Sequence, residues 1–176
     1  MILAKYMPEP HQMAEYTIIP LTDDHARQIL RWRYTAPYDF YNSPDIGLSE
    51  DQYLQQFLNP IYAFHAIVDS QQNFCGFCSF GIDGQVLGGD YTEAALDIGL
   101  GMRPDLTAQG QGAAFFAAIL AFSQSHFYAP QLRLSVAQFN KRALALYAGF
   151  GFRKTAEFTD STHAITYTVL NLDVIT

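Results

Sequence analysis

The sequence lacks any apolar run that approaches the ~20 residues needed for a membrane-spanning helix. The longest candidate, residues 112–122, is rich in Ala and Phe and better suits a buried core helix. A signal peptide is not indicated either, because the first eight residues have no charged start followed by a long apolar stretch. A cytoplasmic protein without a membrane partner is therefore expected.

Basic residues are also scarce, since 10 Lys and Arg stand against 17 Asp and Glu, for a net charge of −7. This balance disfavours nucleic acid as a partner, because phosphate backbones require clustered Lys and Arg. The same charge mildly favours cationic substrates, through long-range steering rather than contact.

Cysteine is limited to Cys75 and Cys78, which form a Cys-x-x-Cys inside the apolar run 74–80. The run predicts a strand, in which a spacing of three puts the two side chains on opposite faces. We therefore interpret both as buried core residues rather than as a redox or zinc motif. No metal site is predicted, because the histidines show no ligand spacing such as i, i+4: His11, His25, His65, His126 and His163.

What is present indicates one well-packed domain. The chain has 176 residues, of which 49% are hydrophobic and 15% aromatic, so disorder is excluded. Residues 1–16 contain two prolines and little pattern, and we interpret them as an N-terminal arm. Residues 17–176 are predicted to form the single domain.

The hydrophobic patterns predict the element order β-α-α-β-β-β-α-β-α-β-β. This order indicates an α/β (α+β) fold, with a mixed, mostly antiparallel sheet of about seven strands and about four flanking helices. The expected strands are 16–20, 62–68, 74–82, 94–102, 131–136, 152–158 and 165–172, and the expected helices are 22–34, 49–59, 112–126 and 140–149.

A glycine-containing loop, residues 104–112, precedes the third helix. Gly110 and Gly112 allow the backbone to approach a ligand closely, and the free N–H groups of a helix start bind anions such as pyrophosphate. A Walker loop is excluded because no Lys-Ser/Thr follows, and a dinucleotide fingerprint is excluded because Phe115 replaces its third small residue. A plain strand-to-helix turn is the alternative interpretation.

The fourth helix begins at Asn140 and is followed by Gly151-Phe152. Asn140 can cap the helix and offer an amide to a ligand, and the small Ala143 lets a ligand lie across the helix. Tyr147 lies two turns after Asn140, on the same face. A phenol there can protonate a leaving thiolate. The alternative is an ordinary amphipathic helix.

Together and in this order, the two segments resemble the acyl-CoA half of a GNAT superfamily N-acetyltransferase. The helix matches the family pattern at Asn140, Ala143, Leu146, Tyr147, Gly151 and Phe152, whereas the loop departs from it at Thr107 and Ala108. The resemblance implies acetyl-CoA as co-substrate, bound by Leu100, Met102, Thr107, Ala108, Gln109, Gly110, Gln111, Gly112, Ala113, Asn140 and Ala143.

The resemblance also implies that the strand over 96–102 splays from its neighbour at 131–136 to admit acyl-CoA. Main-chain groups near Leu100 and Met102 would pair with the pantetheine arm and stabilise the oxyanion. Tyr147 would protonate the CoA thiolate. Asp97 is the candidate base, acting through a water, with an exposed strand-edge role as the alternative, and Glu93 is a weaker candidate.

The segment between the first two helices is rich in aromatic residues, and in GNAT enzymes this region walls the acceptor site. The candidate substrate-binding residues are Trp32, Tyr34, Tyr38 and Tyr41, with Asp39 and Asp45 nearby to hold an ammonium by charge and cation–π contact. The alternative is that these aromatic rings pack the loop onto the sheet.

We therefore expect an N-acetyltransferase in which a primary amine attacks acetyl-CoA directly within a ternary complex. Two alternatives stay open: an acyl-CoA sensor without turnover, and a nucleotide-binding transferase that uses the glycine loop. The acceptor ranges from small amines and polyamines to peptides, and a homodimer is compatible with the sequence.

Overall fold

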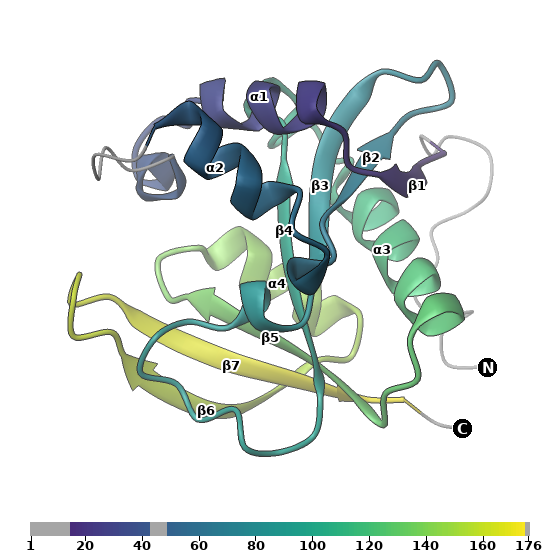
Figure 1. Ribbon diagram of the computed structural model, residues 1–176. Coiled ribbons are helices and arrows are strands. Elements are labelled where there is room, and N and C mark those ends of the chain that lie inside the picture. The colour runs from purple at the N-terminus through teal and green to yellow at the C-terminus, as the bar shows by residue number, and fades with distance from the viewer. Residues whose placement is uncertain (1–14, 43–48, 175–176) are drawn as a thin grey trace.

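The computed structural model describes residues 15–42 and 49–174 (Figure 1). Most of the predicted N-terminal arm, and Asp45, lie outside these residues. The strands are β1 Thr17–Pro20, β2 His65–Val68, β3 Phe74–Phe80, β4 Leu96–Met102, β5 Gln131–Ala137, β6 Arg153–Thr159 and β7 Thr166–Asp173. The α-helices are α1 Asp23–Arg31, α2 Glu50–Phe57, α3 Gly112–His126 and α4 Lys141–Gly149. Short 3-10 turns are η2 Tyr38–Tyr41, η3 Pro60–Tyr62, η4 Ile82–Gly84 and η5 Pro104–Leu106.

The strands form one seven-stranded sheet in the order β1-β2-β3-β4-β5-β7-β6. Every neighbouring pair is antiparallel except β4 and β5, which run parallel and are connected through α3. The predicted fold class, with about seven strands and four α-helices, is confirmed. Among the described residues, no helix is both long and apolar enough to cross a membrane.

The first two helices begin where their capping residues predict. Thr22 accepts a hydrogen bond from the N–H of His25, and Ser49 accepts one from the N–H of Gln52. However, α1 ends at Arg31 rather than near residue 34, because Trp32 adopts an extended conformation. The predicted end of this helix was therefore wrong by about one turn.

The second strand begins later than predicted, at His65 rather than at Tyr62. Pro60 opens the turn η3, and the Asn59 side chain caps it by accepting a hydrogen bond from Ile61 N–H. Ala63 then adopts a left-handed conformation with φ 44°, which is incompatible with a strand. The apolar pattern at 61–64 thus belongs to a turn.

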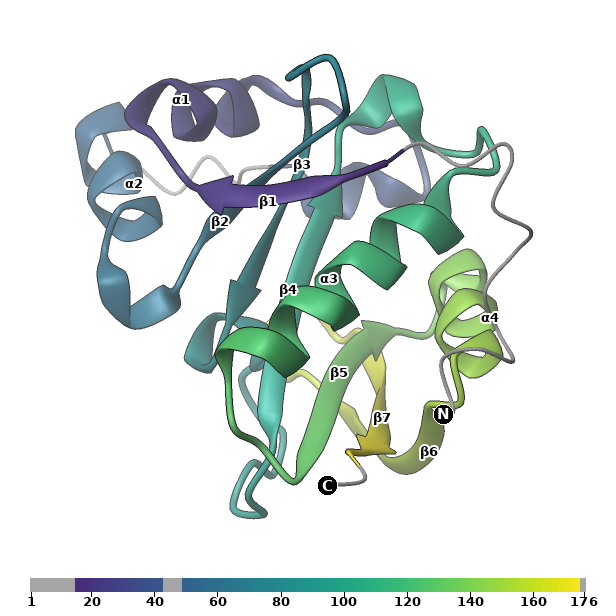
Figure 2. The ribbon, with the colours of Figure 1, turned by 90° about the vertical axis from the view of Figure 1, so that its right-hand side faces the viewer.

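Helices cover both faces of the sheet (Figures 1 and 2). The large core cluster joins α3 and α4 to β4, β5 and β7, and Phe115, Phe116, Ile119 and Leu120 of α3 are at its centre with at most 2% exposure. A smaller cluster, which includes Ile29, Ala66 and Phe74, packs α1 against the other face of β2 and β3. The burial of these apolar side chains provides most of the driving force for this layering.

Candidate active site between strands β4 and β5

Strands β4 and β5 pair over a very short distance. Leu96 pairs with Leu132 and Asp97 with Arg133, and no further pair joins the two strands. Both strands continue for several residues beyond this point, to Met102 and to Ala137. Figure 2 shows them diverging from their shared end. The splayed arrangement predicted from the sequence is therefore present, and we call this gap the opening.

The backbone of β4 alternates between β3 and the opening. Arg103 donates its N–H to the carbonyl of Cys75 at 2.8 Å, and the carbonyl of Asp97 accepts from Gly81 N–H at 2.9 Å, so odd-numbered residues face β3. In an antiparallel ladder the intervening residues face the other way. Leu100 and Met102 therefore direct their N–H and C=O groups into the opening, as their predicted role requires.

The glycine loop lies where β4 leads into α3, and two of its residues have a left-handed backbone conformation. Gly110 has φ 77° and Ala108 has φ 62°, both in the left-handed region. A residue with a Cβ pays about 1–2 kcal/mol for this conformation, so Ala108, one of the two departures of this loop from the GNAT pattern, is strained. Thr107 directs its hydroxyl to the carbonyl of Pro104 at 2.8 Å, and Gln109 directs its amide to the carbonyl of Asp105 at 2.5 Å.

The first turn of α3 has no side-chain cap. Gln111 occupies the capping position without capping, and its side-chain oxygen instead accepts a hydrogen bond from the Tyr16 hydroxyl at 2.6 Å. No acidic residue lies in this turn, which begins with Gly112 and Ala113. The helix start is thus left with donor groups suited to an anion.

Asn140 and Tyr147 occupy the start and the interior of α4. The side-chain oxygen of Asn140 accepts from Ala143 N–H at 3.1 Å, so Asn140 caps the helix as predicted. Its amide nitrogen donates to the Tyr41 hydroxyl at 3.3 Å. Tyr147 is 6% exposed, and its ring packs against Phe116 with centroids 4.7 Å apart.

The Tyr147 hydroxyl makes no hydrogen bond to another described residue. Burial raises the pKa of the Tyr147 phenol well above its ordinary value, and the neighbouring Tyr41 phenol raises it further. The group therefore stays protonated throughout the physiological pH range. A protonated phenol is the form that a proton donor requires.

Residues 34–41, which follow α1, bring three tyrosines to the opening. The Tyr34 hydroxyl donates to the carbonyl of Met102 at 2.7 Å. The Arg142 guanidinium lies over the Tyr38 ring, 4.2 Å from its centroid, and the Tyr41 hydroxyl meets Asn140. Burial raises the pKa of Tyr34 and of Tyr41, so both phenols are protonated.

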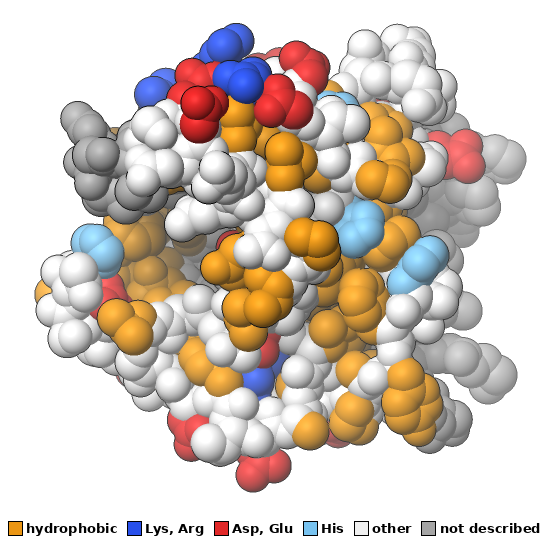
Figure 3. All heavy atoms as spheres, viewed as in Figure 1, with side chains coloured by type: hydrophobic (Ala, Val, Ile, Leu, Met, Phe, Trp, Pro, Cys, Tyr) orange, Lys and Arg blue, Asp and Glu red, His pale blue; other side chains and the backbone are white. Residues whose placement is uncertain are grey.

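Further aromatic side chains lie beside these three tyrosines. The Phe40 ring contacts Tyr41, Phe139 and His163, with centroids 5.6, 6.0 and 5.6 Å apart. Figure 3 shows a hollow on this face, with hydrophobic side chains inside it and a histidine at its edge. The name aromatic wall is used below for six residues: Tyr34, Tyr38, Phe40, Tyr41, Phe139 and His163.

Trp32 does not belong to the aromatic wall. Its indole stacks on Phe74 and Phe77 of β3, with centroids 5.4 and 6.0 Å apart, within the smaller core cluster. The structure thus gives Trp32 a packing role in this cluster. Of the four aromatic residues proposed for the acceptor, the structure brings three to the opening.

Asp97 lies in the interior, at the last residue pair that β4 and β5 share. It is 2% exposed, and its carboxylate accepts from Arg133 Nε at 2.6 Å, from Arg133 Nη2 at 2.8 Å and from Gln85 Nε2 at 2.9 Å. Both oxygens of this buried carboxylate are occupied by the guanidinium, so the alternative interpretation of an exposed strand-edge residue is wrong. The other candidate, Glu93, is exposed, and its backbone carbonyl accepts from Arg133 Nη1 at 3.1 Å.

A second carboxylate, which sequence reasoning missed, lies beside the opening. Asp83 of η4 accepts a hydrogen bond from the Ser79 hydroxyl at 2.5 Å, next to Gly99 of β4. The sequence places Asp83 in a glycine-containing loop without a recognisable motif. Only the register that sets Ser79 opposite Gly99 brings it to β4.

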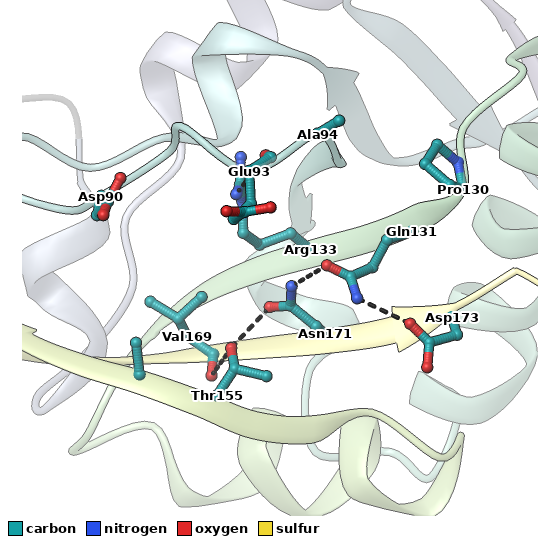
Figure 4. Close-up of a pocket in the computed structure, with 11 residues that line it drawn as sticks. Asp90, Glu93, Ala94, Pro130, Gln131, Arg133, Thr155, Val169, Asn171 and Asp173 are labelled. Atoms are coloured by element: carbon teal, nitrogen blue, oxygen red, sulfur yellow. Dashed lines mark hydrogen bonds between the residues drawn. The ribbon is translucent and has the colours of Figure 1, made fainter.

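A separate cavity of about 510 Å³ lies beside the first residues of β5 (Figure 4). Its polar side chains bond to each other: Gln131 donates to Asp173 at 2.8 Å, Asn171 donates to Gln131, and Thr155 donates to Asn171 at 2.9 Å. None of the residues predicted to bind acyl-CoA lines this cavity. The opening, rather than this cavity, is the candidate site.

Comparison with known proteins identifies the family. Residues 24–152 match the sequence model of the acetyltransferase (GNAT) family. This segment is more than half of the chain and includes the opening, the glycine loop and α4. The chain therefore belongs to the GNAT family of acyl-CoA-dependent N-acyltransferases. No curated protein sequence matches it significantly.

Solved structures with the same fold include spermidine N-acetyltransferase from Vibrio cholerae in complex with CoA and spermine. It superposes with a TM-score of 0.71 at 16% identity, covering 90% of this chain and 95% of that one. A chimera of the Vibrio cholerae enzyme with hSSAT gives 0.70 at 17% identity, covering 91% and 96%. A proposed acetyltransferase from Acinetobacter baylyi gives 0.65 at 13% identity, covering 93% and 95%. At these identities the likeness establishes the fold.

Proposed function

We propose that the protein transfers an acetyl group from acetyl-CoA to a primary amine, which attacks the thioester directly in a ternary complex. The observation that carries this proposal is the opening between β4 and β5. It presents the backbone of Leu100 and Met102, which pairs with no strand on this side, and it has the uncapped start of α3 at one end. Helix α4 brings Tyr147 near the Tyr41 phenol. A pantetheine arm with a pyrophosphate at one end and a thioester at the other matches these groups in kind and order.

In this proposal the pyrophosphate binds the backbone N–H groups of the loop 107–113. The helix dipole and the free donors of the first turn attract its charge, and Gly110 and Gly112 allow close approach. Asn140 and Ala143 contact the pantetheine from α4. Thr107 and Gln109 contribute through the backbone, because their side chains are bonded within the loop.

The chemistry needs an oxyanion donor and a proton donor. The N–H of Leu100 faces the opening and supplies the first. Tyr147 supplies the second, to the sulfur of the departing CoA. Burial raises the phenol pKa, but a thiolate that leaves into the same environment has its own pKa raised for the same reason, so proton transfer stays accessible.

The acceptor binds on the other side of the opening, against the aromatic wall. The aromatic rings of Tyr34 and Tyr41 lie there, which suits a cationic amine, whereas one face of the Tyr38 ring is covered by the Arg142 guanidinium. The net charge of −7 favours the approach of such an amine. The binding of spermine and CoA in the Vibrio cholerae structure supports an amine acceptor in this fold.

Asp97 has a structural part in this proposal. Its ion pair with Arg133 fixes the residue pair at which β4 and β5 separate. It thereby sets where the opening begins, and it does not accept the proton of the amine.

Calorimetry with acetyl-CoA, with CoA and ATP as comparison ligands, tests the donor half. We expect micromolar binding of acetyl-CoA and CoA and none of ATP. Thiol release in the presence of an amine panel that includes spermidine and spermine then tests turnover. Binding without turnover of any amine would favour the sensor alternative, and binding of ATP in preference to CoA would favour a nucleotide-binding transferase.

A further inference from the structure

The turn η4 is packed directly against the backbone of β4 at the start of the opening. A Cβ on Gly84 would lie 2.9 Å from the nitrogen of Ile98, so glycine is required for this contact. Gly81, with φ 97°, turns the chain toward β4 and donates its N–H to the carbonyl of Asp97 at 2.9 Å. These contacts fix the position of Asp83, one of the two residues between these glycines.

The Asp83 carboxyl lies over Gly99. A Cβ on Gly99 would lie 3.0 Å from Asp83 Oδ2 and 2.3 Å from Ser79 Oγ, so the absence of a side chain at Gly99 creates the space for both groups. Gly99 is two residues beyond Asp97, the last residue of β4 that pairs with β5, and it precedes Leu100. Asp83 is therefore at the closed end of the opening, next to the proposed oxyanion donor.

One oxygen of Asp83 is held and the other is available. Oδ2 accepts the Ser79 hydroxyl hydrogen at 2.5 Å, whereas Oδ1 has no hydrogen-bond partner among the described residues. The Asp83 residue is exposed although its carboxyl is partly buried against Ser79, whereas Asp97 is 2% exposed. A substrate amine, or a water bound to it, can reach Asp83 but cannot reach Asp97.

The surroundings also suit Asp83 to accept a proton. The protein around the carboxyl raises the pKa of Asp83 above its ordinary value, because it removes water that would stabilise the charge, and the Ser79 hydrogen bond acts in the opposite direction. The elements packed against η4 are β3, β4 and η3. Their titratable residues are Asp97, neutralised by Arg133, the buried thiols of Cys75 and Cys78, and Tyr62.

We propose that Asp83 is the proton acceptor for the attacking amine and that Ser79 is its positioning residue. This inference rests on the proposed function. It assigns to a residue of η4 the role of base, for which Asp97 was the candidate from the sequence. Gly81, Gly84 and Gly99 then belong to the active site, because they position Asp83.

The ammonium of the acceptor gives one proton to Asp83, directly or through a water, and Asp83 passes it to solvent. The free amine forms a C–N bond to the thioester carbonyl, the C–S bond breaks, and sulfur keeps the electron pair and takes a proton from Tyr147. The nitrogen then loses its second proton through water, which restores the phenol. The products are the amide, CoA thiol and one released proton.

Three variants test the assignment: Asp83→Asn, Ser79→Ala and, as a matched control, Asp90→Asn. Asp90 is an exposed carboxylate in the same loop, and it accepts a hydrogen bond from the Thr92 hydroxyl. For each variant, kcat/KM with the best amine of the panel is measured from pH 5 to 9, together with the Kd of acetyl-CoA and the unfolding midpoint. The last two measurements separate lost chemistry from lost structure.

For Asp83→Asn we expect a fall of about 10²-fold or more in kcat/KM at neutral pH, with unchanged acetyl-CoA affinity. The acid limb that belongs to Asp83 disappears, and activity then rises with pH only as the free amine deprotonates. Ser79→Ala removes a hydrogen bond that lowers the Asp83 pKa, so its acid limb moves to higher pH. Asp90→Asn retains the wild-type profile.

If the wild type is active and kcat/KM of Asp83→Asn stays within threefold of the wild-type value at every pH, this inference alone is overturned. An unmoved acid limb in Ser79→Ala would remove the positioning role. Acetyl-CoA binding without turnover of any amine by the wild type would overturn the proposed function and this inference together.

Discussion

Asp97 and Arg133 form a bidentate, buried ion pair at the last residue pair that β4 and β5 share. Their side chains are 2% and 3% exposed, with Nε to Oδ1 at 2.6 Å and Nη2 to Oδ2 at 2.8 Å. Parallel strands that pair at two positions only are weakly held by backbone hydrogen bonds. The ion pair therefore marks, and stabilises, the point from which the candidate site opens.

Breaking this pair is expected to destabilise the fold. Asp97→Asn leaves the Arg133 charge buried without a counter-charge, which typically costs about 3–5 kcal/mol. The double variant Asp97→Leu, Arg133→Met removes both charges and should lose less. Urea unfolding measures the free energies, and a loss below about 1 kcal/mol in Asp97→Asn would contradict the structural role.

Tyr147→Phe separates binding from chemistry. The ring packing against Phe116 is retained, so the Kd of acetyl-CoA should stay near that of the wild type. The proton for the CoA sulfur is lost, so kcat should fall by about 10²- to 10⁴-fold. Steady-state kinetics with calorimetry checks this, with Tyr128→Phe, an exposed tyrosine, as control. An unchanged kcat would remove Tyr147 from the mechanism.

The two glycines of the loop should respond differently to alanine. Gly110→Ala forces a Cβ into φ 77° and should cost about 1–2 kcal/mol of stability. On Gly112 a Cβ would meet Leu146 at an ordinary 3.5 Å, so stability should hold. Any loss of acetyl-CoA affinity in Gly112→Ala then reports close approach of the ligand. Equal loss of stability in both variants would speak against this distinction.

The stability of Asp83→Asn should depend on pH in a particular direction. The folded-state pKa of Asp83 is raised, so its contribution to stability is present below the unfolded pKa of about 4 and is lost as pH rises through the folded value. Asn does not ionise, so the variant should gain stability relative to the wild type from pH 3 to pH 7, measured as urea midpoints.

Asp90→Asn is a control whose stability should change with pH in the opposite direction. Hydrogen bonds from Thr92 lower the pKa of Asp90, so its contribution is present above the unfolded pKa and is lost as pH falls. The variant should therefore lose stability relative to the wild type at pH 7 and approach it at pH 3. If the stability of both variants relative to the wild type changed in the same direction with pH, the pKa of Asp83 would not be raised in the folded protein.

Features that depend on near neighbours in the chain could be predicted. The caps Thr22, Ser49 and Asn140 bond to residues three positions away, and the glycine loop and Tyr147 are recognised by spacing within one segment. The element order followed from periodicity in the same way. Errors occurred at element ends, where Trp32 and Ala63 take conformations that packing and local turns impose.

Features that depend on partners far along the chain could not be predicted. Asp97 was recognised as a carboxylate near the opening, but its partner is 36 residues away on a neighbouring strand. Trp32 was assigned to the acceptor site because nothing in the sequence shows that Phe74 and Phe77 lie beneath it. The register of β3 and β4 decides that Asp83 lies over Gly99.

The sequence by itself determined the family and the fold class, and it offered the loop and helix residues that are proposed to hold an acyl-CoA, because short motifs specify the local backbone shape. Only the tertiary structure decided which carboxylate is paired with an arginine in the interior and which one lies over Gly99, two residues beyond the point where β4 leaves β5. The charge state and reach of a side chain depend on the groups that strand pairing and packing bring around it, and these come from distant parts of the chain.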